Sequence, residues 1–436
     1  MNEKASSTST TNRRVFLKST GAAVLGGAAT LNLGLSSETF GSGSNTLRVG
    51  LVGCGGRGTG AASQALHADP DVILTAMGDA FRDRLDESHG NLTKISPDKV
   101  KVDEERKFVG FDAYRQVIDS DVDVVILATP PGFRPDHLTA AVAAGKHVFC
   151  EKPVAVDAPG VRKVIEAAKQ AKEKNLSLLS GFTYRFDNPR RALFARVLDG
   201  EIGEVRTVSS TRNGGTLWYK PRQAEWSDME YQLRNWYYYN WLSGDFIVEM
   251  IVHSMDMMSW ALGDQVPLRA TGTGGRQART DEKWGNIYDH FAVEYEFNDE
   301  VRGFNLCRQQ NGGSMRNTVE IAGTEGNAYV RDGGCQITGK NPWRYQGEQN
   351  DPYQTQHDEL FAAIRQNQPI NHGDFMANST MIAILGRMVG YSGQTITWEE
   401  AMNSGQSLGP AADDYHWDLS WPGPAVAVPG VTKVLG

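Results

Sequence analysis

A glycine-rich turn near the start of the chain has the spacing of a phosphate-binding loop. The residues GCGGRG, 53–58, follow the apolar stretch LRVGLV and precede a helical pattern. In such a GxGxxG turn Gly53 permits the tight bend, Gly55 lets the backbone approach a pyrophosphate, and Gly58 lets helix and strand pack closely. The turn predicts a nucleotide site.

Asp79 adds a second element of that site, because it ends the next apolar strand 21 residues after Gly58. A carboxylate at this place binds the adenosine ribose hydroxyls, and it would repel the 2′-phosphate of NADP. Arg57 and Arg82 are close in sequence and weaken this preference. We expect NAD as cofactor, with NADP as the alternative.

A histidine with two acidic neighbours lies on a predicted helix from Glu249 to Leu262. The periodicity places Glu249 and His253 four residues apart on one face, with Asp256 one turn further on. Imidazole has an unperturbed pKa of about 6.5, so it can accept a hydroxyl proton near neutral pH and return it. Taken alone, a histidine on an apolar helix is more often a core residue. These three side chains also have the types and spacing of metal ligands, but hydride transfer to a nicotinamide needs no metal, and we expect none.

A more specific pattern is VVILATPPGFRPDHLTAAVAAGKHVFCEKPVA, 124–155. It resembles the Gfo/Idh/MocA family (glucose-fructose oxidoreductase, inositol dehydrogenase and MocA), whose members carry TP after this strand, a following His, then AGKHV and EKP. The resemblance continues through GEIGEV and GDFIVEMIVHSMDMMSWALG, and the later GTEGNAYV and GRMVGYSGQTITWEEAMNS are similar to an exported bacterial branch. It covers nearly everything from Leu47 to Ser404.

This resemblance implies roles for the matching residues. Lys152 would lie beside the nicotinamide, where a lysine stabilises the alkoxide character that develops as hydride leaves carbon. Glu151 would touch the nicotinamide ribose, and His253 would be the general base. The matching positions Thr129, Pro130 and His137 are assigned to the cofactor site with Arg57.

One residue departs from the family pattern. The dehydrogenases usually place Asp four residues before the histidine, whereas this chain has Glu249. We expect the longer carboxylate to orient the imidazole or to bind a neighbouring hydroxyl of the substrate. The departure therefore predicts an altered substrate fit.

The elements that must position these residues alternate between strand and helix in the first part of the chain. The strands LRVGLV, VILTAM and VDVVILAT alternate with helical patterns, which predicts a doubly wound parallel sheet of Rossmann type. Consecutive strands without helices follow, which predicts an α+β domain with a mostly antiparallel open sheet. The predicted divisions are an export signal and linker 1–45, a nucleotide domain 46–181, a substrate and oligomerisation domain 182–404, and an irregular tail 405–436.

The second domain contains an aromatic segment, because nine of the 24 residues from Trp218 to Trp241 are aromatic. Such side chains suit the C–H face and hydroxyl rim of a pyranose. An oligomer interface or a core patch uses the same chemistry, and both alternatives stay open. The predicted substrate contacts are Arg185, Asn235, Trp236, Asp256 and His357.

Composition excludes some classes of protein. The net charge of −8 and the absence of a long basic block argue against nucleic acid as a partner. The four cysteines, Cys54, Cys150, Cys307 and Cys335, have no metal or disulfide spacing, so we expect free thiols, although Cys54 and Cys150 are able to approach each other.

The N-terminus has the parts of a secretory signal. The run RRVFLK, 13–18, matches the twin-arginine pattern, and the mildly apolar stretch after it contains four glycines. We expect export by the twin-arginine machinery to the periplasm, with a membrane anchor as the outcome if the signal is not cleaved. Because this route moves folded proteins, we also expect a tightly bound cofactor.

Together these features predict an exported NAD-dependent oxidoreductase that acts on a secondary hydroxyl or ketone of a sugar, glycoside or cyclitol. One alternative is a glycosidase-like enzyme that recycles its NAD through transient oxidation and elimination. The other is a sugar-binding protein without catalysis. A homo-oligomer, dimer or tetramer, is expected in each case.

Overall fold

The structure is a computed structural model that describes residues 45–298, 300–331 and 334–436. The predicted twin-arginine segment lies outside these residues. Among those that are described, no helix combines the length and the apolar character that crossing a bilayer requires.

The first domain is built on a six-stranded sheet whose strands all run parallel, in the order β3-β2-β1-β4-β5-β6. This order is that of a doubly wound dinucleotide-binding fold, so the predicted Rossmann domain is confirmed. The strands are β1 (Leu47–Val52), β2 (Val72–Asp79), β3 (Lys107–Val109), β4 (Val124–Leu127), β5 (His147–Cys150) and β6 (Leu178–Ser180).

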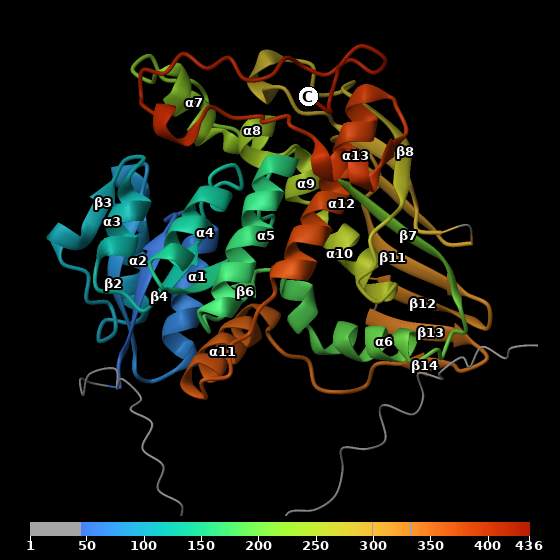
Figure 1. Ribbon diagram of the computed structural model, residues 1–436, viewed down its shortest axis with the longest axis horizontal. Coiled ribbons are helices and arrows are strands. Elements are labelled where there is room, and N and C mark those ends of the chain that lie inside the picture. Colours follow the sequence, from blue (N-terminus) through green and yellow to red (C-terminus); the bar gives the residue numbers. More distant parts are fainter. Residues whose placement is uncertain (1–44, 299, 332–333) are drawn as a thin grey trace, which may run out of the picture. The chain divides into compact units, whose positions relative to one another are not determined.

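Helices cover both faces of this sheet (Figure 1). Successive residues of a strand point to opposite faces, so in β4 Val124 and Ile126 pack in one apolar cluster while Val125 and Leu127 pack in another. One face is covered by α1 (Gly56–Ala68), α2 (Arg82–Ile95) and α11 (Pro352–Arg365), and the other by α3 (Ala113–Asp119), α4 (Arg134–Ala143) and α5 (Ala158–Glu173). Because α11 follows the second sheet in the chain, the two domains share this part of the core.

The second sheet has nine strands in the order β14-β13-β12-β11-β7-β10-β9-β8-β15, and every pair except β7 with β10 is antiparallel. The predicted mostly antiparallel sheet is thereby confirmed, with β13 to β15 in addition. Its strands are β7 (Val205–Gly214), β8 (Arg269–Gly275), β9 (His290–Glu296), β10 (Arg302–Gln309), β11 (Arg316–Gly323), β12 (Gly326–Arg331), β13 (Gly334–Gly339), β14 (Trp343–Arg344) and β15 (Ile396–Thr397).

Helices that pack on one face of this sheet connect it to the first domain. They include α6 (Asn188–Leu198), α10 (Val252–Ala261) and α12 (Gly373–Ser392). Smaller helices are α7 (Asp228–Arg234), α8 (Asn240–Ser243), α9 (Phe246–Glu249) and α13 (Trp398–Asn403). The single helix predicted from Glu249 to Leu262 is wrong in one respect, because α9 ends at Glu249 and α10 begins only at Val252.

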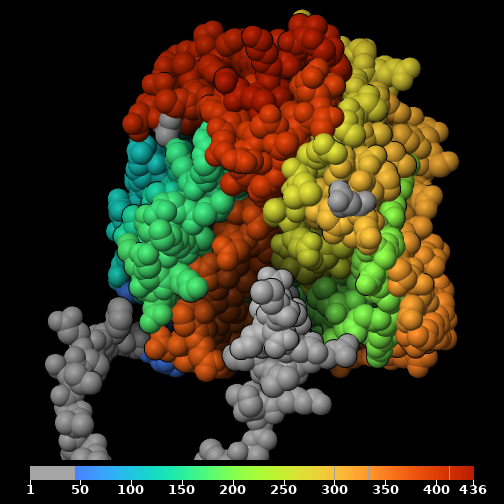
Figure 2. Space-filling model, turned by 45° about the vertical axis from the view of Figure 1, so that its right-hand side comes forward, coloured from blue at the N-terminus to red at the C-terminus, as the bar shows by residue number. Residues whose placement is uncertain are grey.

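The C-terminal tail runs over the molecule beside α7 and α8, and the space-filling view shows it spread across one end (Figures 1 and 2). Its aromatic rings pack on rings of the first domain. Trp417 lies 5.3 Å from Phe81 and 4.7 Å from Phe111 between ring centroids, and Tyr415 lies 5.1 Å from Phe133. The tail therefore ties the two domains together.

Candidate active site

The glycine turn adopts the geometry that its sequence predicts. Gly53 has φ of 96°, and a Cβ there would lie 2.6 Å from the backbone of Ala128 and Thr129. A Cβ on Gly58 would lie 1.8 Å from the Gly53 carbonyl oxygen, so only glycine lets α1 pack against β1. At Gly55 an added Cβ would meet no protein atom within 4 Å. The turn and the amino end of α1 border open space suited to a pyrophosphate.

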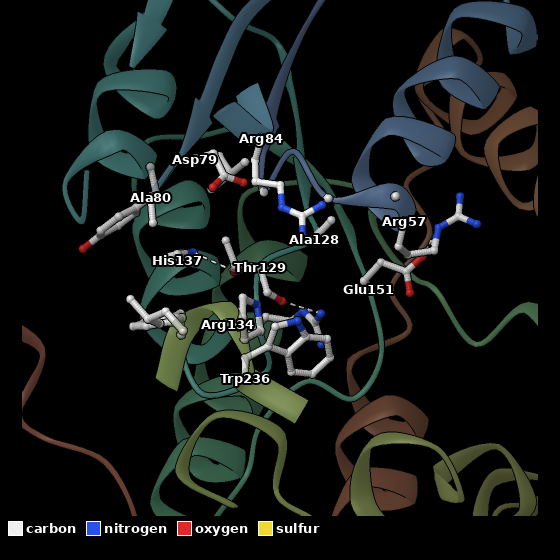
Figure 3. A pocket seen from close by; sticks show the side chains of 18 of the residues that line it. Arg57, Asp79, Ala80, Arg84, Ala128, Thr129, Arg134, His137, Glu151 and Trp236 are labelled. Atoms are coloured by element: carbon white, nitrogen blue, oxygen red, sulfur yellow. Dashed lines mark hydrogen bonds and ion pairs between the residues drawn. The ribbon is translucent and has the colours of Figure 1, made fainter. Parts of the chain in front are cut away.

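That space is a cavity of about 580 Å³ with walls from both domains (Figure 3). The predicted site residues that line it are Gly53, Gly55, Arg57, Asp79, Thr129, Pro130, His137, Glu151, Lys152, Trp236, Glu249 and His253. The structure thus brings together one end of each domain around a volume typical of cofactor sites.

Asp79 lies at the carboxyl end of β2 with its carboxylate fixed by the backbone. One oxygen accepts from the Cys54 amide at 2.7 Å and the other from the Phe81 amide at 2.9 Å. Burial raises the pKa of this carboxyl above its ordinary value. Each oxygen retains a lone pair for a ribose hydroxyl.

The arginine beside Asp79 is Arg84, rather than the predicted Arg82. Arg84 reaches into the cavity in Figure 3, whereas Arg82 pairs with Asp86 and Glu104 on the outer side of α2. Arg82 and Arg84 are two residues apart in the first turn of α2, so their side chains point to different sides of the helix. The sequence did not show which of the two sides faces the cavity.

Arg57 and Glu151 link the glycine turn to the turn after β5. Their side chains form an ion pair at 3.1 Å, and the Glu151 side chain is 3% exposed. Arg57 also donates to Gln64 at 2.5 Å and lies over the Tyr353 ring at 4.7 Å. Glu151 is therefore fixed at the cavity wall.

Thr129 and His137 form a further part of the wall, where the Thr129 hydroxyl and the His137 Nδ1 are 3.1 Å apart. The His137 ring stacks on Tyr114 with centroids 4.0 Å apart. Burial and the nearby Arg134 lower the pKa of His137 to about 3. His137 is thus a neutral structural element of the cavity at physiological pH.

Lys152 projects from the first domain and is held by the second. Its Nζ donates to the Glu249 carbonyl oxygen at 2.7 Å and to Glu249 Oε1 at 3.0 Å. The expected contact of Glu249 is corrected here, because its carboxylate pairs with Lys152, whereas His253 Nδ1 is buried without a hydrogen-bond partner. The break between α9 and α10 separates Glu249 from the helical face that carries His253.

Arg134 supports the same turn and was missed by sequence reasoning. Its guanidinium donates to the Pro153 carbonyl and, at 2.5 Å, to the Thr129 carbonyl. It also lines the cavity. The only available signal was an arginine at the start of a helix beside the TP motif, which is not distinctive.

His253 lines the cavity and lies next to two aromatic rings. Its ring centroid is 4.8 Å from Tyr184 and 5.9 Å from Phe182. Burial first, and then the charges of Lys152, Arg212 and Arg190, lower the pKa of His253 well below its ordinary value. The imidazole is neutral near pH 7, which is the form that accepts a proton.

Arg185 and Asp256 do not line the cavity, which corrects the predicted substrate contacts. The Arg185 guanidinium donates two bonds to Asp256, at 2.8 and 3.0 Å, and a further bond to Asp264 at 2.6 Å. Asp256 also accepts from Ser379, and it is 1% exposed. This network joins α10 and α12 and leaves neither group free for a sugar.

Asn235 and His357 are also placed away from the cavity. The Asn235 side chain is 0% exposed and bonds the backbone of Lys220 and Tyr231, so it holds the aromatic segment together. His357 packs in α11 against Phe149 at 4.2 Å, and burial lowers its pKa to about 3. Gly58 does not line the cavity either. It lets α1 pack closely against the glycine turn, which is the role that the sequence predicted for it.

The aromatic segment divides between the two roles that were left open. Trp218 and Trp236 line the cavity, while Tyr237, Tyr238 and Trp241 are buried in the core. Rings that sequence reasoning missed, Phe81, Phe111 and Phe133, line the cavity from the first domain. The second domain therefore contributes a wall that contains Trp218 and Trp236, here called the roof, to a cavity with aromatic walls.

The alternative that Glu249, His253 and Asp256 bind a metal ion is not supported by the arrangement of the described residues. Within the described ranges, no group of three or more His, Cys, Asp or Glu side chains is placed to hold a metal ion. The four cysteines are free and buried.

Comparison with known proteins agrees with this arrangement over both domains. The Gfo/Idh/MocA model described as an oxidoreductase family with an NAD-binding Rossmann fold matches residues 47–178, and the Gfo/Idh/MocA C-terminal domain matches residues 191–329. The chain belongs to the Gfo/Idh/MocA family. Its first domain is an NAD-binding Rossmann domain, as the glycine turn and Asp79 predicted.

Individual relatives of this Gfo/Idh/MocA protein include cyclitol and sugar enzymes. The inositol 2-dehydrogenase of Rhizobium meliloti is 30% identical over 253 residues, which are 57% of this chain and 64% of the relative. The chain spans only about half to two thirds of the curated relatives' length.

Solved structures show the same fold. The scyllo-inositol dehydrogenase of Lactobacillus casei with bound NAD(H) and scyllo-inositol has a TM-score of 0.62 at 20% identity, covering 81% of this chain and 100% of that one. The aldose-aldose oxidoreductase of Caulobacter crescentus has a TM-score of 0.65 at 18% identity, with the same coverage.

Proposed function

We propose that the protein is an NAD-dependent oxidoreductase that transfers hydride between the cofactor and a secondary hydroxyl or ketone of a sugar, glycoside or cyclitol. The observation that carries this proposal is the convergence of Lys152 and His253 on one cavity with the glycine turn. Named dehydrogenases of inositols among the relatives support the cyclitol or sugar class.

The residues of the chain divide the chemistry between them. Gly53, Gly55 and Asp79 hold the nucleotide, which when bound supplies the hydride acceptor. Neutral His253 accepts the hydroxyl proton of the substrate, and Lys152 donates a hydrogen bond to the oxygen as negative charge develops on it. Glu249 keeps the ammonium group of Lys152 in place.

Replacing Asp79 tests the cofactor half of the site. We expect Asp79→Asn to weaken NAD binding about tenfold or more, because a charged acceptor to the ribose hydroxyls is lost. Calorimetric titration of NAD measures this. Asp86→Asn, which changes an exposed carboxylate of the following helix α2, serves as the control, and equal affinity in both variants would show that Asp79 does not bind the ribose.

The charges around His253 predict a pH profile. Since the pKa of His253 is lowered, the rate of oxidation should not begin to fall at about pH 6.5, the ordinary pKa of imidazole. It should fall only at lower pH, where His253 is protonated. Arg212→Gln removes one of the lowering charges, so the acidic limb of kcat/KM should move to higher pH. A limb that stays in place, or moves to lower pH, would argue against His253 as the base.

We further propose that the protein is exported and retains its NAD. The cavity walls Phe81, Phe111 and Phe133 are covered by Tyr415 and Trp417 of the tail, and Arg234 of the roof pairs with Asp83 of α2 at 3.0 Å. We propose that these contacts must separate before NAD can leave. Export by the twin-arginine route would then carry the cofactor out with the folded chain.

Weakening the tail tests this retention. In the double variant Tyr415→Ala/Trp417→Ala, four ring contacts to the cavity walls and the area they bury are lost. We expect the dissociation rate of NAD to rise about tenfold, measured by following release into excess competitor. His416→Ala, an exposed neighbour, should leave the rate unchanged, and an unchanged rate in the double variant would show that the tail does not retain NAD.

A retained cofactor favours a second candidate function in which the NAD is recycled within the site. The hydride would return to a second carbonyl substrate, or to the same molecule after elimination. Such a turnover forms product without net NADH, whereas a simple dehydrogenase forms one NADH per product. The measured ratio separates the two. A sugar-binding role without catalysis is disfavoured because Lys152 and His253 are both in place.

The expected homo-oligomer has a candidate surface on the outer face of the second sheet. Phe304 and Leu306 of β10 are 37% and 54% exposed there, and such rings and aliphatic chains in a sheet centre are suited to a subunit contact. Light scattering of wild type and Leu306→Glu tests this, with a monomeric variant as the expected result.

A further inference from the structure

Arg134, the first residue of α4, is a buried cation on the wall of the cofactor cavity. Its side chain is 5% exposed, and Figure 3 shows it beside Thr129 and Trp236. Burial lowers the pKa of its guanidinium from the ordinary value, but an arginine in a protein keeps its proton at physiological pH. The residue therefore holds a full positive charge inside the protein.

Arg134 has hydrogen bonds but no carboxylate partner. Its guanidinium donates to the main-chain carbonyl groups of Thr129 and Pro153, and its Nε is buried without a partner. In the part of the chain that the structure describes, no acidic side chain lies within ion-pair distance of it. A buried cation usually has such a partner, because removing a charge from water is costly.

The other cations near Lys152 are balanced by acidic groups. Arg57 pairs with Glu151 at 3.1 Å, and Lys152 pairs with Glu249 at 3.0 Å. Both carboxylates are close enough to raise the pKa of Arg134 through space, so Arg134 lies at the same end of the cavity as Lys152. When the two ion pairs are set aside, the charge of Arg134 remains uncompensated among these groups of the wall.

The nicotinamide ring binds at this end of the cavity under the proposed function, because Lys152 would lie beside it. The ring of NAD carries a positive charge, whereas the ring of NADH is neutral. A nearby cation therefore disfavours bound NAD relative to bound NADH. Since binding and reduction are linked, a site that binds NADH more tightly makes the bound NAD a stronger hydride acceptor.

We propose that the unpaired charge of Arg134 makes the site prefer NADH and thereby favours oxidation of the substrate hydroxyl. In that step the substrate carbon loses a hydride to the nicotinamide ring, and the hydroxyl proton passes to His253. Arg134 does not touch the reacting atoms and acts through its charge alone. The proposal rests on the proposed function and assigns the favoured direction of the reaction at that same site.

The test is the ratio of two dissociation constants, that of NAD divided by that of NADH. Competition between the two nucleotides, followed by the fluorescence of bound NADH, measures the ratio without any sugar. Wild type should bind NADH about tenfold more tightly. Arg134→Gln should remove most of this preference, and Arg134→Lys, which keeps a positive charge, should retain it. If Arg134 only held the Pro153 carbonyl in place, its loss would weaken both forms alike and leave the ratio unchanged.

Arg84→Gln is the matched control. It removes another arginine of the cavity, beside Asp79 at the adenosine end, where NAD and NADH are identical. Its ratio should equal that of wild type. If Arg134→Gln folds poorly, Arg134→Met removes the same charge and takes its place in the comparison.

Three results would overturn the role of Arg134 while leaving the proposed function intact. They are equal affinity of wild type for both nucleotides, a ratio that stays the same when the charge is removed, and an equal fall of the ratio in Arg134→Lys. Binding of neither nucleotide would instead contradict the proposed function, and the role of Arg134 with it.

Discussion

Lys152→Met should lower kcat for sugar oxidation by about 10³-fold, the cost of removing a donor that stabilises a developing oxyanion. The ammonium group is held at 2.7 Å by the Glu249 carbonyl and at 3.0 Å by its carboxylate, so it is positioned before substrate arrives. Methionine keeps an unbranched side chain, shorter by the terminal nitrogen, and so removes the charge and the donors. Steady-state NADH formation measures the effect.

The loss of kcat in Lys152→Met reports on the chemical step only if the variant still binds NAD. NAD affinity of Lys152→Met should stay within severalfold of wild type, because the glycine turn and Asp79 are untouched. Lys163→Met, which removes an exposed lysine of α5 that pairs with Asp136, should have wild-type kcat. A kcat for Lys152→Met within tenfold of the control would remove this lysine from the mechanism.

His253→Asn should lower kcat/KM by about 10²- to 10⁴-fold, the usual contribution of a general base. Because protonation of His253 causes the acidic limb, the residual activity of the variant should lose that limb and become independent of pH in this range. Water then takes the proton. The measurement is the pH profile of both proteins.

His67→Asn supplies the control for this replacement, since His67 is an exposed residue in the last turn of α1 and does not line the cavity. It should reproduce the wild-type profile. Were His253→Asn to keep the acidic limb, another group would be the base. If the His253→Asn variant kept full activity, His253 would be a buried core residue without a catalytic role, as is common for a histidine on an apolar helix.

The parts of the site that the sequence predicts are those determined by local geometry. Gly53 and Gly58 are required by contacts within one strand-turn-helix unit, and Asp79 is fixed by the end of the adjacent strand. The alternation of strands and helices predicts the doubly wound parallel sheet in the same way. Short-range pattern was sufficient for all of these.

Contacts between distant segments were not predictable in the same way. Glu249 was expected beside His253, but a break between α9 and α10 redirects it to Lys152, 97 residues away. Arg185 and Asp256 have the residue types of a sugar site, yet they satisfy each other at the α10 and α12 packing surface. Which polar side chains pair with each other therefore depends on how the fold places distant segments, and the local sequence pattern does not contain this information.

The tail shows the same limit. Its prolines and its lack of periodicity gave no sign that Tyr415 and Trp417 pack over the rings of the cofactor cavity. Stacking depends on where an irregular segment runs, and this is fixed by many weak contacts along its length. Our proposal that the protein retains NAD therefore rests on the position of the tail in the structure and not on its sequence.

The central claim is that a cavity containing bound NAD carries out hydride transfer from a sugar or cyclitol hydroxyl. The most direct measurement is the near-ultraviolet absorbance of the purified, NAD-loaded protein after rapid mixing with a panel of inositols, hexoses and disaccharides. We expect at least one compound to produce a rapid rise in NADH absorbance that approaches the amount of bound nucleotide, and we expect Lys152→Met to abolish this rise. A nucleotide-loaded protein whose absorbance is unchanged by every compound, at saturating concentration, would contradict it.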